Sequence, residues 1–134
     1  FREFHLAKLL AVTHKPQTLW CEWEFNSDYS HNECNTPTFD LRIITAALLQ
    51  VRDTLTELNI DAYSGGHGRP YSDVVPCHVV GAPPTALTSF DQTQTLAIPL
   101  AFLNGLTVPA KGEGFLQHCL PRSLGVLMLR ENLF

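Results

Sequence analysis

The sequence predicts an α/β protein, with a mixed sheet packed by a long amphipathic helix, and three observations carry this prediction. Apolar and polar residues alternate from Leu19 to Phe25, which is typical of a half-buried strand. Apolar residues from Leu41 to Leu58 step by three and four, which predicts one stripe along a helix. The run Ser123 to Leu129 is apolar at its odd and its even positions, which predicts a strand covered on both faces.

The chain is predicted to form a single domain over residues 1–134. At 134 residues and 45% hydrophobic composition it can bury one sizeable core. It begins at Phe1 rather than at Met. We therefore interpret it as a processed or trimmed product, or as a fragment of a larger domain.

Composition disfavours two classes of partner. Charged residues make up 16% of the chain and its net charge is −4, so it lacks the basic surface that follows a phosphate backbone, and no nucleic acid is expected. No apolar run reaches the roughly 18 to 20 residues that span a bilayer, so no membrane span is expected. A soluble, cytoplasmic protein is the expectation, although no targeting segment fixes the compartment.

The N-terminal region predicts a helix and then a strand. Residues 1–12 have a short helical pattern that ends near Pro16, because the residue before a proline is pushed out of the helical region. Its expected apolar contacts are Phe4, Leu6, Leu9 and Leu10. In the strand that follows, Trp20 lies with two glutamates on the solvent side. The polar stretch 26–35 is predicted to be a surface loop.

The long helix is expected to begin with Thr36 as its cap and Pro37 at its first position, with Asp40 adding favourable charge. It would run for about five or six turns, too short to favour a coiled coil. Its apolar stripe comprises Leu41, Ile44, Leu48, Val51, Leu55 and Leu58. Its solvent side carries Arg42, Gln50, Arg52, Asp53, Thr54 and Glu57.

A glycine-rich loop follows the predicted short strand Ile60 to Tyr63. The loop runs from Ser64 to Pro70, and its amide groups, together with Arg69, suit an anion. Phosphate-binding loops open a helix, whereas here the next pattern, Val74 to Val80, is extended. A flexible surface loop is therefore the favoured interpretation.

The stretch 95–110 predicts core structure. Its first half is a short apolar helix, broken or started at Pro99 and stopped by Asn104 and Gly105, because glycine adopts the left-handed cap conformation. Residues 106–109 then predict a short buried strand. No chemistry is visible in this stretch.

The cysteines do not define a site. Cys21, Cys34, Cys77 and Cys119 are even in number but form no Cys-x-x-Cys pair, and buried free thiols are at least as well supported as disulfides. Their disulfide state stays open. Nothing local selects a nucleophilic Cys–His pair.

A zinc site from His31, Cys34, Cys77 and His78 is conceivable, since zinc accepts imidazole and thiolate ligands. Adjacent residues point to opposite faces of a strand, however, which makes joint ligation by residues 77 and 78 awkward. The sequence therefore predicts no catalytic, cofactor-binding or metal-binding residue, and no cofactor.

The C-terminal half contains a series of short motifs, namely Asn104-Gly105-Leu106, Thr107-Val108-Pro109-Ala110, the turn Lys111 to Gly114, Leu120-Pro121 and Leu124 to Arg130. With these motifs, residues 40–130 resemble the C-terminal part of the amidase signature family. In that family, a strand with Gly-Leu-Pro and Val-Pro-Ala-Gly leads through a turn to a strand with Leu-Pro, Gly and Leu-Gln-Leu-Ile-Gly. Leu58 to Ala62 also matches its Asp-bearing strand after a helix.

The resemblance implies the C-terminal segment of an amide hydrolase. The family's nucleophilic Ser, bridging Ser and Lys come from a Gly/Ser-rich region further upstream, and neither Lys8, Lys15 nor Lys111 lies beside such a signature. Ser64-Gly65-Gly66 follows the long helix and lacks the second Ser. The segment would therefore be inactive alone, with a small amide substrate only as part of a complete enzyme. Whether the chain is an enzyme stays open.

The alternative is a small stand-alone α/β or α+β domain that binds a ligand or protein without catalysis. The fragment interpretation adds an expectation about surface. Interior segments taken from a larger fold leave apolar area that drives association. We therefore expect a partner chain, a homo-oligomer, or a fold in which residues 1–25 cover that area. The residues expected to report it are Leu100, Leu103, Val126 and Met128.

Overall fold

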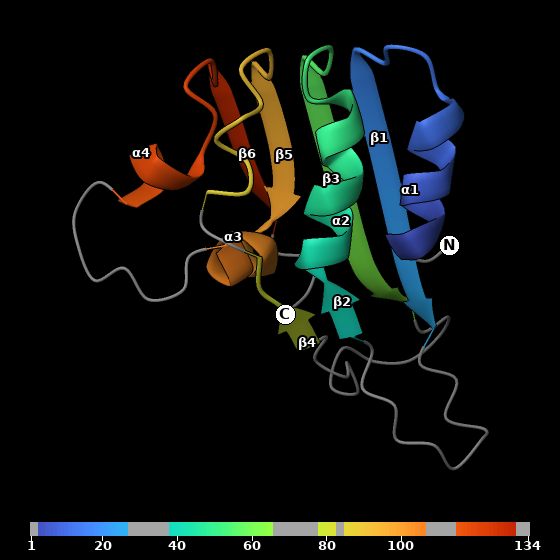
Figure 1. Cartoon of the computed structure of the whole chain (residues 1–134). Helices are drawn as coiled ribbons and strands as arrows, with labels where there is room; N and C mark the ends of the chain where they lie inside the picture. Colours follow the sequence, from blue (N-terminus) through green and yellow to red (C-terminus); the bar gives the residue numbers. More distant parts are fainter. Residues whose placement is uncertain (1–2, 27–37, 66–77, 83–84, 107–114, 131–134) are drawn as a thin grey trace.

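The computed structural model describes residues 3–26, 38–65, 78–82, 85–106 and 115–130. A four-stranded sheet has the order β1-β3-β5-β6, and β2 pairs with β4 in a second, two-stranded sheet (Figure 1). The elements are α1 (Glu3–Val12), β1 (Thr18–Asn26), β2 (Thr38–Asp40), α2 (Leu41–Leu48), the 3₁₀ turn η1 (Leu49–Val51), β3 (Glu57–Gly65), β4 (His78–Val80), β5 (Thr95–Pro99), α3 (Leu100–Leu106), α4 (Phe115–Cys119) and β6 (Val126–Arg130).

All strand pairs in both sheets are parallel. The α/β prediction is confirmed, whereas a mixed sheet is wrong for the described strands. The four strands of the main sheet follow one another in a single direction across it. Right-handed crossovers that always step the same way place their connections on one face. In Figure 1, α2, which lies on the connection from β1 to β3, is in front of the sheet, and α1 packs beside it.

The predicted apolar stripe is buried as expected. The side chains of Leu41, Ile44, Leu48, Val51 and Leu55 all lie in the core. They pack there with alternate residues of the strands, such as Leu58 and Ile60. The stripe therefore buries α2 and the turn after it against the sheet.

The helix is shorter than predicted at both ends. Thr36 and Pro37 lie outside the described residues, and since residues 38–40 form β2, the helix begins at Leu41. It gives way to η1 after Leu48, and Leu58 belongs to β3. Leu58 lies three residues after Leu55, as in a helix, and two residues before Ile60, as in a strand. The apolar pattern alone therefore does not show whether Leu58 is helical or in a strand.

The N-terminal helix is confirmed, although its burial is narrower than expected. Leu6 and Leu10 lie in the core, while Phe4 and Leu9 are half-exposed. The strand that follows is also confirmed, with Leu19, Cys21 and Trp23 buried. These residues complete the core between α1, α2 and the sheet.

Residues 95–110 differ from the prediction in their first half. Thr95–Pro99 is a strand, and the helix starts directly after Pro99. Asn104 and Gly105 do not stop that helix, which continues to Leu106. Leu106 is thus helical, and the rest of the strand predicted at 106–109 lies outside the described residues. A buried parallel strand and a buried helix share the same apolar composition, which explains the error.

The C-terminal strand is present as β6, but it is not covered on both faces. It forms an edge of the sheet, and Val126, Met128 and Leu129 are all exposed. Apolar residues at both odd and even positions predicted an interior strand. Among the described strands, however, β6 has only one neighbour, which is β5.

The starts of the strands are tied together by a repeated hydrogen-bond pattern. The carbonyl of Gln17 accepts from the amides of Thr56 and Glu57 at 2.7 and 2.9 Å. The carbonyls of Thr56 and Gln94 each accept two amides of the next strand in the same way. The hydroxyl of Thr93 donates to the carbonyl of Leu55 at 2.9 Å. This pattern fixes the register at the amino ends of the strands.

Aromatic side chains join the small sheet to the large one. Trp23 and Phe39 meet edge to face with centroids 5.1 Å apart, and Phe39 packs on Phe102 of α3 at 4.3 Å. None of the helices in the described ranges combines the length and the hydropathy required to cross a bilayer.

Candidate functional site: the open face of the sheet

The hydrophobic core of the described residues lies on one face of the main sheet. Side chains alternate across a strand, so the residues between the core positions lie on the opposite face. We call this the open face and define it by the residues 18, 20 and 22 of β1, 57, 59 and 61 of β3, 95, 97 and 99 of β5, and 126, 128 and 130 of β6.

Large apolar side chains of the open face are exposed to solvent. Trp20 is 73% exposed, Val126 49% and Met128 44%. Trp20, Asn59, Ala97 and Met128 form one row, because each is the register partner of the next. The two bulky members lie on the edge strands, and the two small members lie buried on the inner strands.

Asn59 is an unusual residue for the middle of this row. It is only 7% exposed, and its Oδ1 atom has no hydrogen-bond partner among the described residues. A buried polar group costs about 1 to 3 kcal/mol when its hydrogen bond is missing. The open face therefore contains an acceptor that the described chain leaves unsatisfied.

An ion pair on the same face joins the carboxyl end of β6 to the middle of β3. Arg130 donates from Nη1 to Oδ2 of Asp61, and both side chains are partly buried. Glu22 is the register partner of Asp61, and Pro99 is the register partner of Arg130. The pair therefore spans β5, the strand between β3 and β6. The hydrogen-bonded ladder between β3 and β5 ends before Pro99, which has no amide hydrogen to donate.

Two further carboxylates of the open face are exposed and form no ion pair with a described residue. Glu57 on β3 is the register partner of Thr18, and Glu22 lies two residues after Trp20 on β1. Trp20 therefore has two carboxylates near it on the open face, one two residues further along β1 and one diagonally across on β3. This arrangement suits the recognition of a cation and offers no nucleophile or acid–base pair.

The structure places two of the four cysteines, and both are buried free thiols. Burial raises the pKa of Cys21 to about 11 and also raises the pKa of Cys119. A thiol that stays protonated near neutral pH is a poor nucleophile. Neither residue forms a disulfide in this structure, and Cys21 is poorly suited to act as a nucleophile.

The other candidate residues are not brought together. His31, Cys34 and Cys77 lie outside the described residues, as does Arg69 with most of the glycine-rich loop. Only the backbone of His78, which opens β4, is described. Within the described ranges, no three His, Cys, Asp or Glu side chains gather as metal ligands would. The zinc and anion hypotheses stay predictions.

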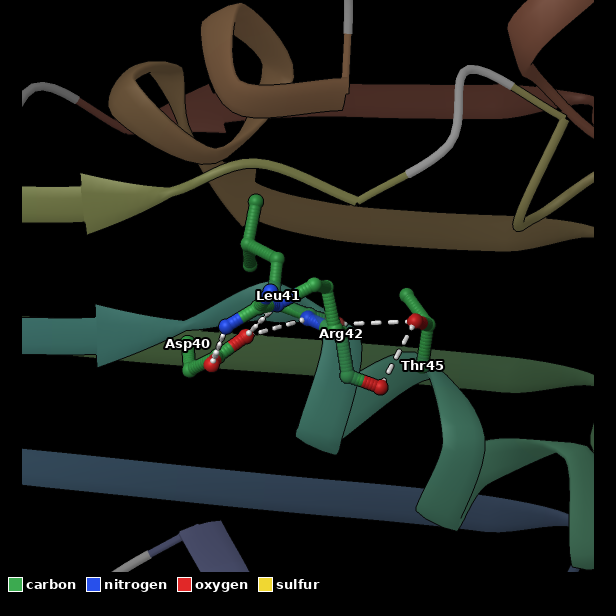
Figure 2. A network of polar contacts seen from close by, with 4 residues as sticks. All are labelled: Asp40, Leu41, Arg42 and Thr45. Atoms are coloured by element: carbon green, nitrogen blue, oxygen red, sulfur yellow. Dashed lines mark hydrogen bonds and ion pairs between the residues drawn. The ribbon is translucent and has the colours of Figure 1, made fainter.

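The polar network at the start of α2 has a structural role (Figure 2). Asp40 caps the helix by accepting from the amide of Arg42 at 2.9 Å, and it also accepts from Nε and Nη2 of that residue at 3.0 and 2.6 Å. These hydrogen bonds hold the pKa of Asp40 below its usual value. Asp40 was predicted to favour this helix end, and it does so as the cap itself.

Comparisons with protein-family models, curated proteins and solved structures gave no match. The amidase resemblance therefore rests on its own residues. Sequence reasoning missed the open face, although one signal was present. Trp20 occupies the solvent side of an alternating strand, where two glutamates are its neighbours in the pattern.

Proposed function

We propose that this chain is a non-catalytic binding segment whose open face is covered by another layer of protein. The observation that carries the proposal is the exposure of Trp20, Val126 and Met128 on one face of a parallel sheet. Parallel sheets in proteins are almost always covered on both faces. Exposed apolar patches mark interaction surfaces, and tryptophan is enriched at their energetic centres.

A second candidate gives this layer a more specific identity, as the rest of an amide hydrolase of the amidase signature type. The resemblance in residues 40–130 favours it. In a complete enzyme of that type, the chain would complete the sheet while other residues perform the chemistry. The candidate predicts no turnover by this chain alone.

Binding of an apolar dye tests the binding proposal. We expect the purified chain to bind the dye, and we expect a variant with Trp20→Ser, Val126→Ser and Met128→Ser to bind it less. Phe4→Ser with Leu9→Ser is the matched control, because these half-exposed residues lie on α1 instead. A chain that binds no dye, or equal effects of the two sets of substitutions, would contradict the proposal.

Release of ammonia from aliphatic and aromatic amides tests the absence of catalysis. We expect no turnover, because Cys21 and Cys119 are buried with raised pKa values and the described residues present no acid–base pair. Turnover that is abolished by one Ser or Cys substitution in this chain would overturn the non-catalytic part of the proposal.

A further inference from the structure

We propose that the layer covering the open face is an amphipathic helix of a partner protein, with an apolar stripe and a flank of lysine or arginine residues. This inference rests on the proposed function and adds the chemistry of the partner. Three features of the open face carry it: its row of apolar side chains, its unbalanced negative charge and the unsatisfied amide of Asn59.

The apolar row defines the part of the partner that packs. Helices are the elements that cover the faces of parallel sheets. Trp20 and Met128 lie on the edge strands, with buried Ala97 between them in register. A helix lying along the inner strands would contact both exposed side chains through one stripe of apolar residues.

The charges of the open face define the flank of the partner. Arg130 neutralises Asp61, whereas Glu22 and Glu57 have no cationic partner among the described residues. Both lie near Trp20, one on its own strand and one on the neighbouring strand. An ammonium or guanidinium group over the indole would gain a cation–π contact, and further cations along the same flank would pair with the two carboxylates, because Glu57 lies opposite Thr18 and Glu22 lies opposite Asp61.

The same charges argue against a second copy as the occupant. A second open face would bring another Glu22 and Glu57 toward the first pair, and like charges across an interface disfavour association. The chain as a whole also carries a net charge of −4. A basic partner is therefore better matched than this chain is to itself.

The third feature is the unsatisfied acceptor in the centre of the row. Oδ1 of Asn59 is buried and has no hydrogen-bond partner among the described residues. A small shift of a flanking side chain would let a donor from the covering helix reach it. The partner would then remove a cost that the uncovered sheet bears.

Two stapled helical peptides of about 15 residues test the inference. They share one leucine stripe and differ only in a flank of lysine or of glutamate, and anisotropy of a dye on each peptide reports binding to the whole chain. We expect the lysine peptide to bind about tenfold more tightly than the glutamate peptide, the scale of a few exposed charge pairs. Added salt should reduce this ratio, because it screens exposed charges.

Three variants locate the binding. Glu22→Gln with Glu57→Gln should remove most of the preference for lysine, and Trp20→Ala should weaken both peptides. Phe4→Ala, a half-exposed residue of α1, is the matched control and should change neither affinity. Circular dichroism verifies that each variant is folded.

The outcomes separate the two proposals. Equal affinity of both peptides, both weakened by Trp20→Ala, would leave the binding face intact and overturn its preference for a basic partner. Affinity that ignores Trp20→Ala would overturn the docking position. Failure of both peptides to bind would also overturn the helix proposal, whereas the dye experiment with the Trp20→Ser, Val126→Ser and Met128→Ser variant judges the binding function separately.

Discussion

Arg130 at the end of β6 donates to Asp61 on β3, so an ion pair joins two strands that are not neighbours in the sheet. The strand between them is β5, whose last residue, Pro99, is fully buried. The carboxyl end of β6 is thereby tied across Pro99 to the middle of β3 on the open face. This contact supplements the backbone ladders at a point where Pro99 cannot donate a hydrogen bond.

Asp61→Asn should lower the free energy of unfolding by about 1 kcal/mol, because it leaves a partly buried guanidinium without its counter-charge. Arg52→Gln is the matched control, since Arg52 and Asp53 are 3.4 Å apart and well exposed. Its effect should stay below about 0.5 kcal/mol. Urea denaturation measures both, and equal losses would show that burial of the pair does not matter.

Leu48→Asp should be severely destabilising, by more than about 3 kcal/mol, because it places an unpaired charge in the core. The neighbouring Leu49 is half-exposed, so Leu49→Asp should have little effect. The two substitutions are chemically identical and one residue apart. Thermal unfolding followed by circular dichroism compares them, and a similar fall in Tm would refute the buried position of the stripe.

The stripe also shows how far the sequence predicts the fold. The α/β class, the helix at residues 3–12, the strand after it and the burial of Leu41 to Leu55 follow from periodicity. The residue at which the helix ends does not follow from periodicity. Leu58 fits both a helical step from Leu55 and the alternation of a strand, so the pattern extended the predicted helix into β3. The strand 95–99 was missed because a short buried strand has no periodicity to distinguish it from a helix.

The candidate site was less predictable than the fold. Exposure of Met128 depends on β6 being an edge strand, and the sequence of an edge strand need not differ from that of an interior one. The contact between Asp61 and Arg130 joins residues far apart in sequence across an intervening strand. Only the register of the whole sheet brings such residues together.

Asp40→Ala should lower the free energy of unfolding by about 1 kcal/mol through loss of the helix cap. The pKa of Asp40 is lower in the folded chain than its ordinary value. Its contribution is therefore fully present above the unfolded pKa of about 3.9 and is lost as the pH falls through the lower native value. Denaturation at pH 7 and at pH values of about 2 to 3 should show the difference between the variant and the parent shrinking. A constant difference would contradict the charged cap.

Asn59→Leu should raise the free energy of unfolding of the isolated chain by about 1 kcal/mol, because it replaces a buried acceptor without a partner by an apolar side chain of similar size. Asn59→Asp is the opposing variant and should destabilise the chain by burying a charge. Urea denaturation ranks the three proteins. A loss of stability in Asn59→Leu would mean that the amide is satisfied in solution.

The single direction in which the strands cross the sheet also has a kinetic consequence. Thr18 pairs with Glu57 and Thr95 with Val126, so each of these ladders joins residues at least about 30 positions apart, and no hairpin is available to start the main sheet. Loops must close before any strand gains a neighbour, which makes folding slow and leaves strand edges unpaired for longer. Conditions that speed this closure should therefore improve the yield of refolded protein even where they leave its final stability unchanged.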